Sequence, residues 1–93
     1  MAKPDMVKQL GIDGQQDIGL QFPSGLALSL DNAYLYICDY GNKRIVRYHI
    51  PTSSVETCVN DPERIHPLAL CFNSSGDLYF SDTLNNAIYI VHS

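Results

Sequence analysis

The 93-residue chain repeats part of its own sequence with a period of about 43 residues, and this repeat limits the folds open to it. The segment Pro23–Leu28 matches Pro67–Phe72 at an offset of 44, and Leu35–Asp39 matches Leu78–Asp82 at an offset of 43. One residue is therefore lost in the turn after the first matching segment, where a deletion is tolerated. A partial match joins Val7–Gly11 to Val55–Val59. The chain thus contains two copies of one structural unit and the end of a third.

Short apolar or alternating runs predict β-strands, and no helical periodicity is sustained over a dozen positions. β-Branched and aromatic residues are common in these runs, which suits a pleated surface. Glycine, proline, asparagine, aspartate and serine separate the runs and favour turns. The eight predicted strands are Met6–Leu10, Leu26–Leu30, Tyr34–Cys38, Arg44–Ile50, Val55–Val59, Leu68–Phe72, Leu78–Ser81 and Ala87–His92. Each unit then has three strands, followed by a fourth that leads into the next unit.

Four short strands in about 43 residues have the dimensions of one β-propeller blade. The sequence therefore predicts an all-β fold of two four-stranded antiparallel blades. In this division, residues 6–21 form an outer strand and linker, residues 22–60 the first blade, and residues 66–93 the first three strands of the second blade. The predicted core consists of Leu26, Leu28, Leu35, Ile37, Ile45, Leu70, Phe72, Leu78, Phe80 and Ile88.

The first unit resembles an NHL repeat. Its segments Phe22–Ala27 and Leu35–Ile45 follow the family pattern: Pro-x-Gly, an apolar strand, an aromatic-apolar strand ending in Asp, then Gly-Asn-x-Arg-Ile. The second unit departs from it at Ala69, Leu84 and Ala87, which replace two glycines and an arginine. The resemblance covers Phe22 to the end of the chain and implies a propeller fold. It also implies that the flat face made by the loops binds proteins or, in some members, RNA.

Each unit ends its second strand with Asp-x-x-Asn, formed by Asp39 and Asn42 and again by Asp82 and Asn85. An aspartate at this point can accept amide hydrogens across the turn, while asparagine suits a corner of positive φ. This predicts a structural turn motif. The alternative is a pair of metal or substrate ligands, but repetition of the pair in both units favours the turn.

The charge distribution argues against a phosphate-binding surface. Six basic and ten acidic residues give a net charge of −4. The one cationic cluster, Lys43, Arg44 and Arg47, has no counterpart in the second unit, and Arg44 is expected to lie on a solvated rim or to hold a turn carboxylate. We therefore expect no nucleic-acid binding. No apolar run approaches the ~20 residues that cross a membrane, so no membrane association is expected.

The three cysteines, Cys38, Cys58 and Cys71, form no CxxC pair and no metal-ligand spacing. Their odd number argues against a disulfide framework and favours a reducing, cytoplasmic compartment. The amino terminus also lacks the apolar core of a signal peptide. Cys38 and Cys71 are expected to be buried, unreactive thiols. No cofactor or metal ion is expected.

The segment from Pro23 to Tyr48 also resembles the gluconolactonase and strictosidine-synthase propellers. In the gluconolactonase-like enzymes, the residue between Pro and Gly is an Asn or Asp that binds a catalytic calcium ion. Ser24 and Leu68 stand at the two matching positions, and leucine cannot bind a metal. A calcium-dependent lactonase or esterase that lacks its usual ligands is therefore the alternative function. The favoured function is a non-enzymatic protein-interaction module, with Ser24, Tyr40 and Thr83 among the loop residues of its binding face.

Two blades cannot close a ring, so an isolated pair would expose an apolar face at each end. About six large apolar side chains per face, at ~2 kcal/mol each, give on the order of 10 kcal/mol. The strand Met6–Leu10 has no blade before it, and the last blade has no fourth strand. One copy's first strand can complete the next copy's last blade in a head-to-tail ring. We expect a homotrimer of six blades, with a homotetramer as the second choice and a fragment of a longer propeller as the third.

Overall fold

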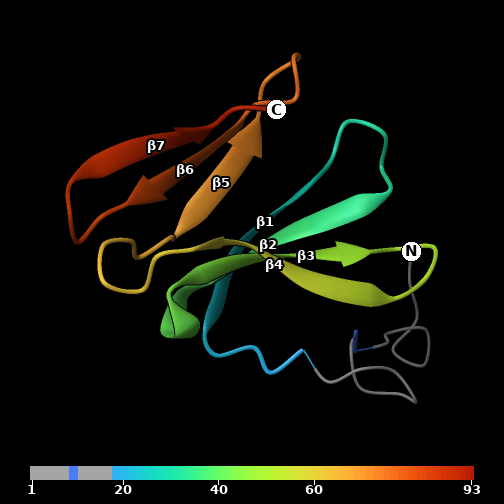
Figure 1. Ribbon diagram of the computed structural model, residues 1–93, viewed down its shortest axis with the longest axis horizontal. Helices are drawn as coiled ribbons and strands as arrows, with labels where there is room; N and C mark the ends of the chain where they lie inside the picture. The colour runs from blue at the N-terminus through green and yellow to red at the C-terminus, as the bar shows by residue number, and fades with distance from the viewer. Residues whose placement is uncertain (1–8, 11–17) are drawn as a thin grey trace, which may run out of the picture.

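The computed structural model describes residues 9–10 and 18–93, whose seven strands form two antiparallel sheets (Figure 1). The first sheet has the order β1 (Pro23–Leu28), β2 (Tyr34–Asp39), β3 (Arg44–His49) and β4 (Ser54–Asn60). The second has the order β5 (Ala69–Phe72), β6 (Leu78–Asp82) and β7 (Ala87–Val91). A short 3₁₀ helix, η2 (Tyr40–Asn42), follows β2. The all-β prediction is confirmed, and no helix in the described part of the chain is long and apolar enough to span a membrane.

Seven of the eight predicted strands form, with ends that differ by up to three residues. The largest difference is in β1, which begins at Pro23 instead of Leu26. A proline at the first position of a strand costs the ladder little, and Pro23 lies opposite Asp39 of β2. The eighth predicted strand, Met6–Leu10, lies outside the described residues except for Gln9 and Leu10, which are not in a strand.

The two sheets share one register. Leu26 lies opposite Ile37 in the first sheet, and the equivalent residues Leu70 and Phe80 lie opposite each other in the second. The same holds for the next pair of strands, where Cys38 faces Ile45 and Ser81 faces Ile88. The offsets of 44 and 43 in sequence are therefore reproduced residue by residue in the strand pairing. The sequence repeat is a structural repeat.

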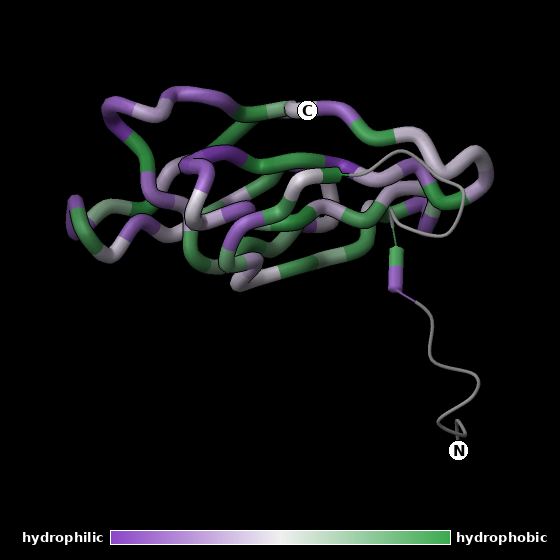
Figure 2. Tube along the Cα trace, turned by 90° about the horizontal axis from the view of Figure 1, so that it is seen from below, coloured by the Kyte–Doolittle hydropathy of each residue, from purple (hydrophilic) through white to green (hydrophobic). Residues whose placement is uncertain are grey.

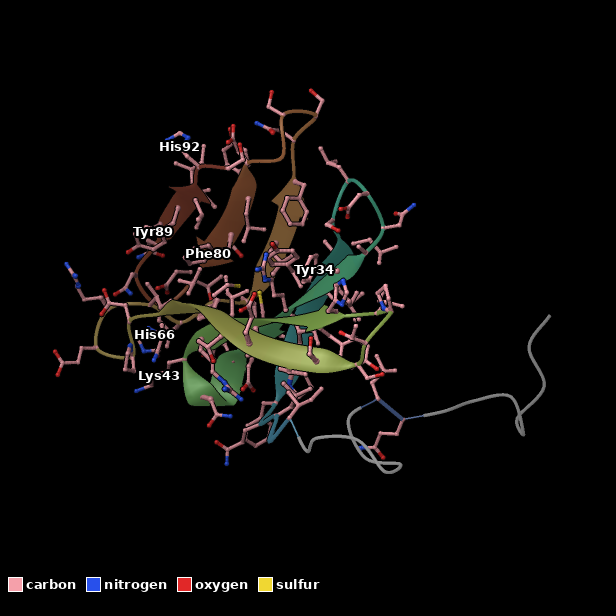
Figure 3. All side chains as sticks on the ribbon, turned by 45° about the vertical axis from the view of Figure 1, so that its right-hand side comes forward. Tyr34, Lys43, His66, Phe80, Tyr89 and His92 are labelled. Atoms are coloured by element: carbon pink, nitrogen blue, oxygen red, sulfur yellow. The ribbon has the colours of Figure 1, made fainter. Side chains whose placement is uncertain are left out.

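The core lies between the sheets, which approach each other through β1 and β5 (Figure 1). Its centre is a cluster of side chains that are at most 5% exposed: Cys38, Ile45, Ile65, Leu78 and Phe80. Aromatic rings extend the cluster, since Tyr36 of the first sheet meets Phe72 of the second edge-to-face at 4.9 Å. Phe80 stacks on Tyr89 at 5.2 Å within the second sheet (Figure 3). The first sheet therefore contributes small and medium side chains to the core, and the second contributes most of the rings.

Three residues of the predicted core are exposed instead. Leu26 is 67% exposed, Leu28 48% and Ile88 71%. Leu26 and Leu28 lie on the edge strand β1, on the face that points away from the inter-sheet core, and Ile88 lies on the outer face of the second sheet. Alternation placed them correctly on a face but could not show which part of a face is uncovered. The neighbours of Leu26 on the same face, Ile37 and Val46, are buried. The prediction of a buried Cys71 is wrong for the same reason. Six buried residues were not predicted to be buried: Asp39, Val46, Tyr48, Ile65, Pro67 and Asp82.

Candidate functional site

The turn after β2 is held by Asp39, whose side chain is fully buried. The backbone N–H of Gln21 donates to Oδ1 at 2.7 Å, and Asn42 Nδ2 donates to Oδ2 at 2.8 Å. Asn42 Nδ2 also donates to the Gly19 carbonyl at 2.9 Å. Asp39 and Asn42 therefore fasten the segment that enters β1 to the turn that leaves β2.

Arg44 balances the charge of this buried carboxylate. Its Nε donates to Asp39 Oδ2 at 2.7 Å, and its two terminal nitrogens donate to Thr57 Oγ1 at 3.1 Å and to the Ile18 carbonyl at 3.0 Å. Of the two roles expected for Arg44, that of holding a turn carboxylate is confirmed. Removing one partner of such a buried ion pair leaves the other charge uncompensated, which is strongly destabilising.

The turn after β6 repeats the arrangement around Asp82, which is also buried. The His66 backbone N–H donates to Oδ2 at 2.8 Å, the Asn85 backbone N–H donates to Oδ1 at 3.0 Å, and Asn85 Nδ2 donates to Oδ2 at 2.7 Å. Asn85 Nδ2 also donates to the Arg64 carbonyl at 2.5 Å. The second turn thus fastens the segment that enters β5, as the first does for β1.

The second turn lacks the arginine of the first, since Ala87 stands where Arg44 does. The His66 ring lies nearest: its Nδ1 is 3.8 Å from Asp82 Oδ2 and has no hydrogen-bond partner among the described residues. Burial raises the pKa of the Asp82 carboxyl, but the hydrogen bonds from Asn85 and His66 outweigh it. The pKa therefore lies below its ordinary value. Asp82 is held as a carboxylate mainly by neutral donors.

Both oxygens of each carboxylate accept hydrogen bonds from the protein, so the two Asp-x-x-Asn pairs act as turn fasteners in this structure. The corners of positive φ fall one residue later than expected, at Lys43 (φ 54°) and Asn86 (φ 52°). No group of three His, Cys, Asp or Glu side chains gathers as a metal site within residues 18–93 and 9–10.

The loop residues predicted for a binding face lie at one end of the two sheets, where the turns after β2 and β6 are on the left in Figure 1. Tyr40 follows Asp39 directly and is half-buried, and Thr83 follows Asp82 and is exposed. Ser24 lies at the start of β1, but its Oγ donates to the Leu68 carbonyl at 2.6 Å. Ser24 therefore joins the two sheets.

Two exposed apolar side chains at this end were not predicted. Phe22, just before β1, is 76% exposed, and Leu84, in the turn after β6, is 61% exposed. In the first unit the equivalent turn residue is Gly41, whose N–H donates to the Gln21 carbonyl at 2.7 Å. A Cβ on Gly41 would lie 2.6 Å from that oxygen, so glycine is required there. In the sequence, the replacement of this glycine by Leu84 indicates that the second turn differs from the first.

Arg47 is the other cation of the first sheet, and its guanidinium is already engaged. It lies over the Tyr34 ring, with 4.3 Å from Cζ to the centroid, and donates to Tyr36 Oη at 3.2 Å. It also pairs with Glu56 on β4. The hydrogen bond with Tyr36, followed by that with Glu56, raises the pKa of Arg47 above its ordinary value. Arg47 thus ties three strands of the first sheet together.

The outer face of the second sheet carries an open apolar hollow of about 220 Å³, lined mainly by Ala69, Cys71, Tyr79 and Ile88. Hydrophobic residues run along the strands of both sheets (Figure 2). On the opposite outer face, that of the first sheet, Leu26 and Leu28 are exposed. The sheet pair therefore presents apolar surface at both ends.

No protein-family model matches the chain, and no curated protein sequence matches it. The NHL resemblance stays a prediction that rests on the residues of the first unit.

Proposed function

We propose that the chain is a non-enzymatic interaction module of the NHL propeller type, in which each sheet is one blade. The observation that supports this proposal is the structural repeat of the first three strands of the unit and of the turn after its second strand. Both sheets have the same strand register, and each ends its second strand with a buried aspartate that fastens the entry to its own first strand. Repeating blades of this kind are stabilised by their neighbours.

The module closes its ring with further copies of itself. Three copies supply six blades and four supply eight, and a homotrimer is the first choice. The segment Met6–Leu10, predicted from sequence to be a strand and similar to part of β4, would pair with the free edge of β7 in the neighbouring copy. The apolar surface at both ends of the sheet pair supports this assembly, because a small protein rarely leaves such patches uncovered. In a longer chain, other blades of the same polypeptide take this place.

The ligand of the module is a protein that binds at the loop end. Exposed Phe22 and Leu84 supply the kind of apolar anchor on which protein interfaces depend, and Tyr40 and Thr83 lie beside the same turns. The net charge of −4 and the pairing of Arg44 and Arg47 within the first sheet argue against a nucleic-acid ligand.

Light scattering coupled to size exclusion tests the assembly. We expect a species of about 31 kDa, three times the 10.4 kDa of the chain, and its loss when residues 1–10 are deleted. A stable monomer, with the mass of one chain, overturns the ring.

The binding face is tested by affinity capture with purified wild-type protein and with the double variant Phe22→Ser/Leu84→Ser. Captured proteins that bind both forms equally overturn the loop-end assignment.

A further inference from the structure

The contact between the two sheets is asymmetric, because it joins unlike faces of equivalent sheets. The first sheet contributes Gly25 and Ala27 from β1, small residues that face the second sheet. The second sheet contributes Leu70 and Phe72 from β5, which pack against the core. Small side chains on one face thus accommodate large side chains on the other.

The outer faces of the two sheets carry the residues equivalent to the two sides of that contact. By the repeat, Gly25 and Ala27 correspond to Ala69 and Cys71, which are exposed on the outer face of the second sheet. Leu70 and Phe72 correspond to Leu26 and Leu28, which are exposed on the outer face of the first sheet. The molecule therefore carries a small-residue face at one end and a large-residue face at the other.

We propose that these two surfaces bind each other between copies: the outer face of β5–β7 in one molecule docks on the outer face of β1 in the next. This inference rests on the proposed self-assembly and specifies its surfaces. The contact repeats the internal packing of β1 on β5 and fills the hollow beside Ala69 and Cys71. It covers Ile88, which is 71% exposed. Ile37 and Val46 share the face of Leu26 but are already buried, so the contact on the first sheet is confined to β1.

Two substitutions make the contact between copies weaker than the contact within one copy. Inside the chain, Ser24 Oγ donates to the Leu68 carbonyl, and the position equivalent to Ser24 is Leu68 itself, whose side chain has no donor. Gly25 lies so close to β5 that an added Cβ would be 2.8 Å from the Leu68 carbonyl and 2.9 Å from Ala69 Cα. The equivalent of Gly25 is Ala69, which carries that Cβ. The docked sheets must therefore separate slightly, and the assembly forms more weakly than the fold.

Mixing two blocked variants tests the pairing of unlike faces. Leu26→Glu blocks one face and Ile88→Glu the other, and both side chains are exposed enough for the fold to remain, which circular dichroism checks. Each variant alone is expected to be monomeric. An equimolar mixture is expected to stop at a one-to-one dimer of about 21 kDa, twice the chain mass of 10.4 kDa, because only one pair of intact faces remains. A variant that assembles like the wild type, or a mixture that stays monomeric, overturns the inference.

A second variant is expected to strengthen the contact. Leu68→Ser combined with Ala69→Gly restores the Ser-Gly pair of the first unit and removes the Cβ that separates the docked sheets. We expect about tenfold tighter assembly, the effect of one hydrogen bond and a relieved contact. Thr52→Ser is the control, since Thr52 lies in the exposed turn between β3 and β4, outside β1 and β5–β7. Weaker or unchanged assembly overturns the inference.

The outcomes separate this inference from the proposed function. A wild-type chain that is monomeric up to millimolar concentration overturns the ring and the docking surfaces together. If the wild type is oligomeric and the oligomer persists with both glutamate substitutions, the docking surfaces alone are overturned and the propeller ring is not.

Alkylation of Cys71, which lines the hollow, gives an independent measurement, because docking is expected to slow it as the protein concentration rises.

Discussion

Ile45 and Ile88 occupy the same register position in their two sheets, yet Ile45 is fully buried and Ile88 is 71% exposed. The backbone around them is equivalent, since each lies opposite the residue just before the turn aspartate. The difference comes only from what covers each sheet. The first sheet has the second sheet against it, and the second has nothing on its outer face within the described residues.

This pair gives the first prediction. Ile45→Ala is expected to lower the free energy of unfolding by about 2–5 kcal/mol, because it opens a cavity in the core. Ile88→Ala is expected to change it by less than about 0.5 kcal/mol in the monomer, since an exposed side chain loses little burial. Urea unfolding of both variants below the concentration of assembly measures the difference. Equal losses would contradict the observed burial.

Asp39→Ala is expected to destabilise the protein by about 3 kcal/mol or more, because it leaves the Gln21 N–H and the Arg44 Nε–H without their acceptor. Asp31→Ala is the matched control. Asp31 also caps a turn, accepting from Ser29 Oγ and the Ala33 N–H, but it is exposed and its loss can be replaced by water. A larger loss of stability in Asp31→Ala than in Asp39→Ala would show that the buried Asp39 carboxylate contributes little to stability.

The third prediction concerns acid stability through Asp82. Its pKa in the folded chain lies below the ordinary value of 3.8, so folding favours the ionised form. The resulting stability is fully present above about pH 5 and is lost as the pH falls through the folded pKa. Asp82→Asn removes this titration, so the stability difference between wild type and variant should shrink between about pH 5 and pH 2. Urea midpoints measured across that range check it; a difference that stays constant is the contrary result.

Thiol labelling under native conditions is expected to distinguish the three cysteines. Burial raises the pKa of Cys38 to about 12, and the residue is fully buried. Cys58 is an exposed residue, but its Sγ donates to the Ile45 carbonyl at 3.3 Å, and desolvation of the thiol raises its pKa to about 11. Cys71 is exposed. Because the thiolate is the reactive form, we expect Cys71 to react first, Cys58 next and Cys38 only on unfolding. Mass spectrometry of a timed iodoacetamide reaction gives the order, and early modification of Cys38 would contradict it.

Local features of the fold could be predicted from the sequence, because strands and turns depend on neighbouring residues. The alternation in Leu35–Asp39 and the turn residues after it predicted β2, its end to within one residue, and the role of Asp39 in the turn. The donors from outside the turn were harder. Gln21 and His66 donate through backbone N–H groups 18 and 16 residues away from their aspartates. Because every residue except proline has this N–H, the residue type gives no indication of such a bond.

The burial of whole faces could not be predicted for a different reason. Alternation assigns Leu26 and Leu70 to equivalent faces, but whether a face is covered depends on what packs against it. The strand pattern of Leu26 is the same as that of Leu70, which does pack against the core. The candidate binding residues Phe22 and Leu84 lie outside strands, where periodicity carries no information about exposure.

The strand order has a consequence for how the chain folds. Every hydrogen-bonded strand pair joins strands that follow each other in sequence, so each sheet is a meander of short hairpins. The main packing between sheets, β1 against β5, joins segments 44 residues apart. Hairpins close over short loops and at little entropic cost, so each sheet can form before the two meet. Loss of the β1–β5 contact then releases β5–β7 as one cooperative unit, and the amide hydrogens of β6 exchange with solvent together with those of its two neighbours.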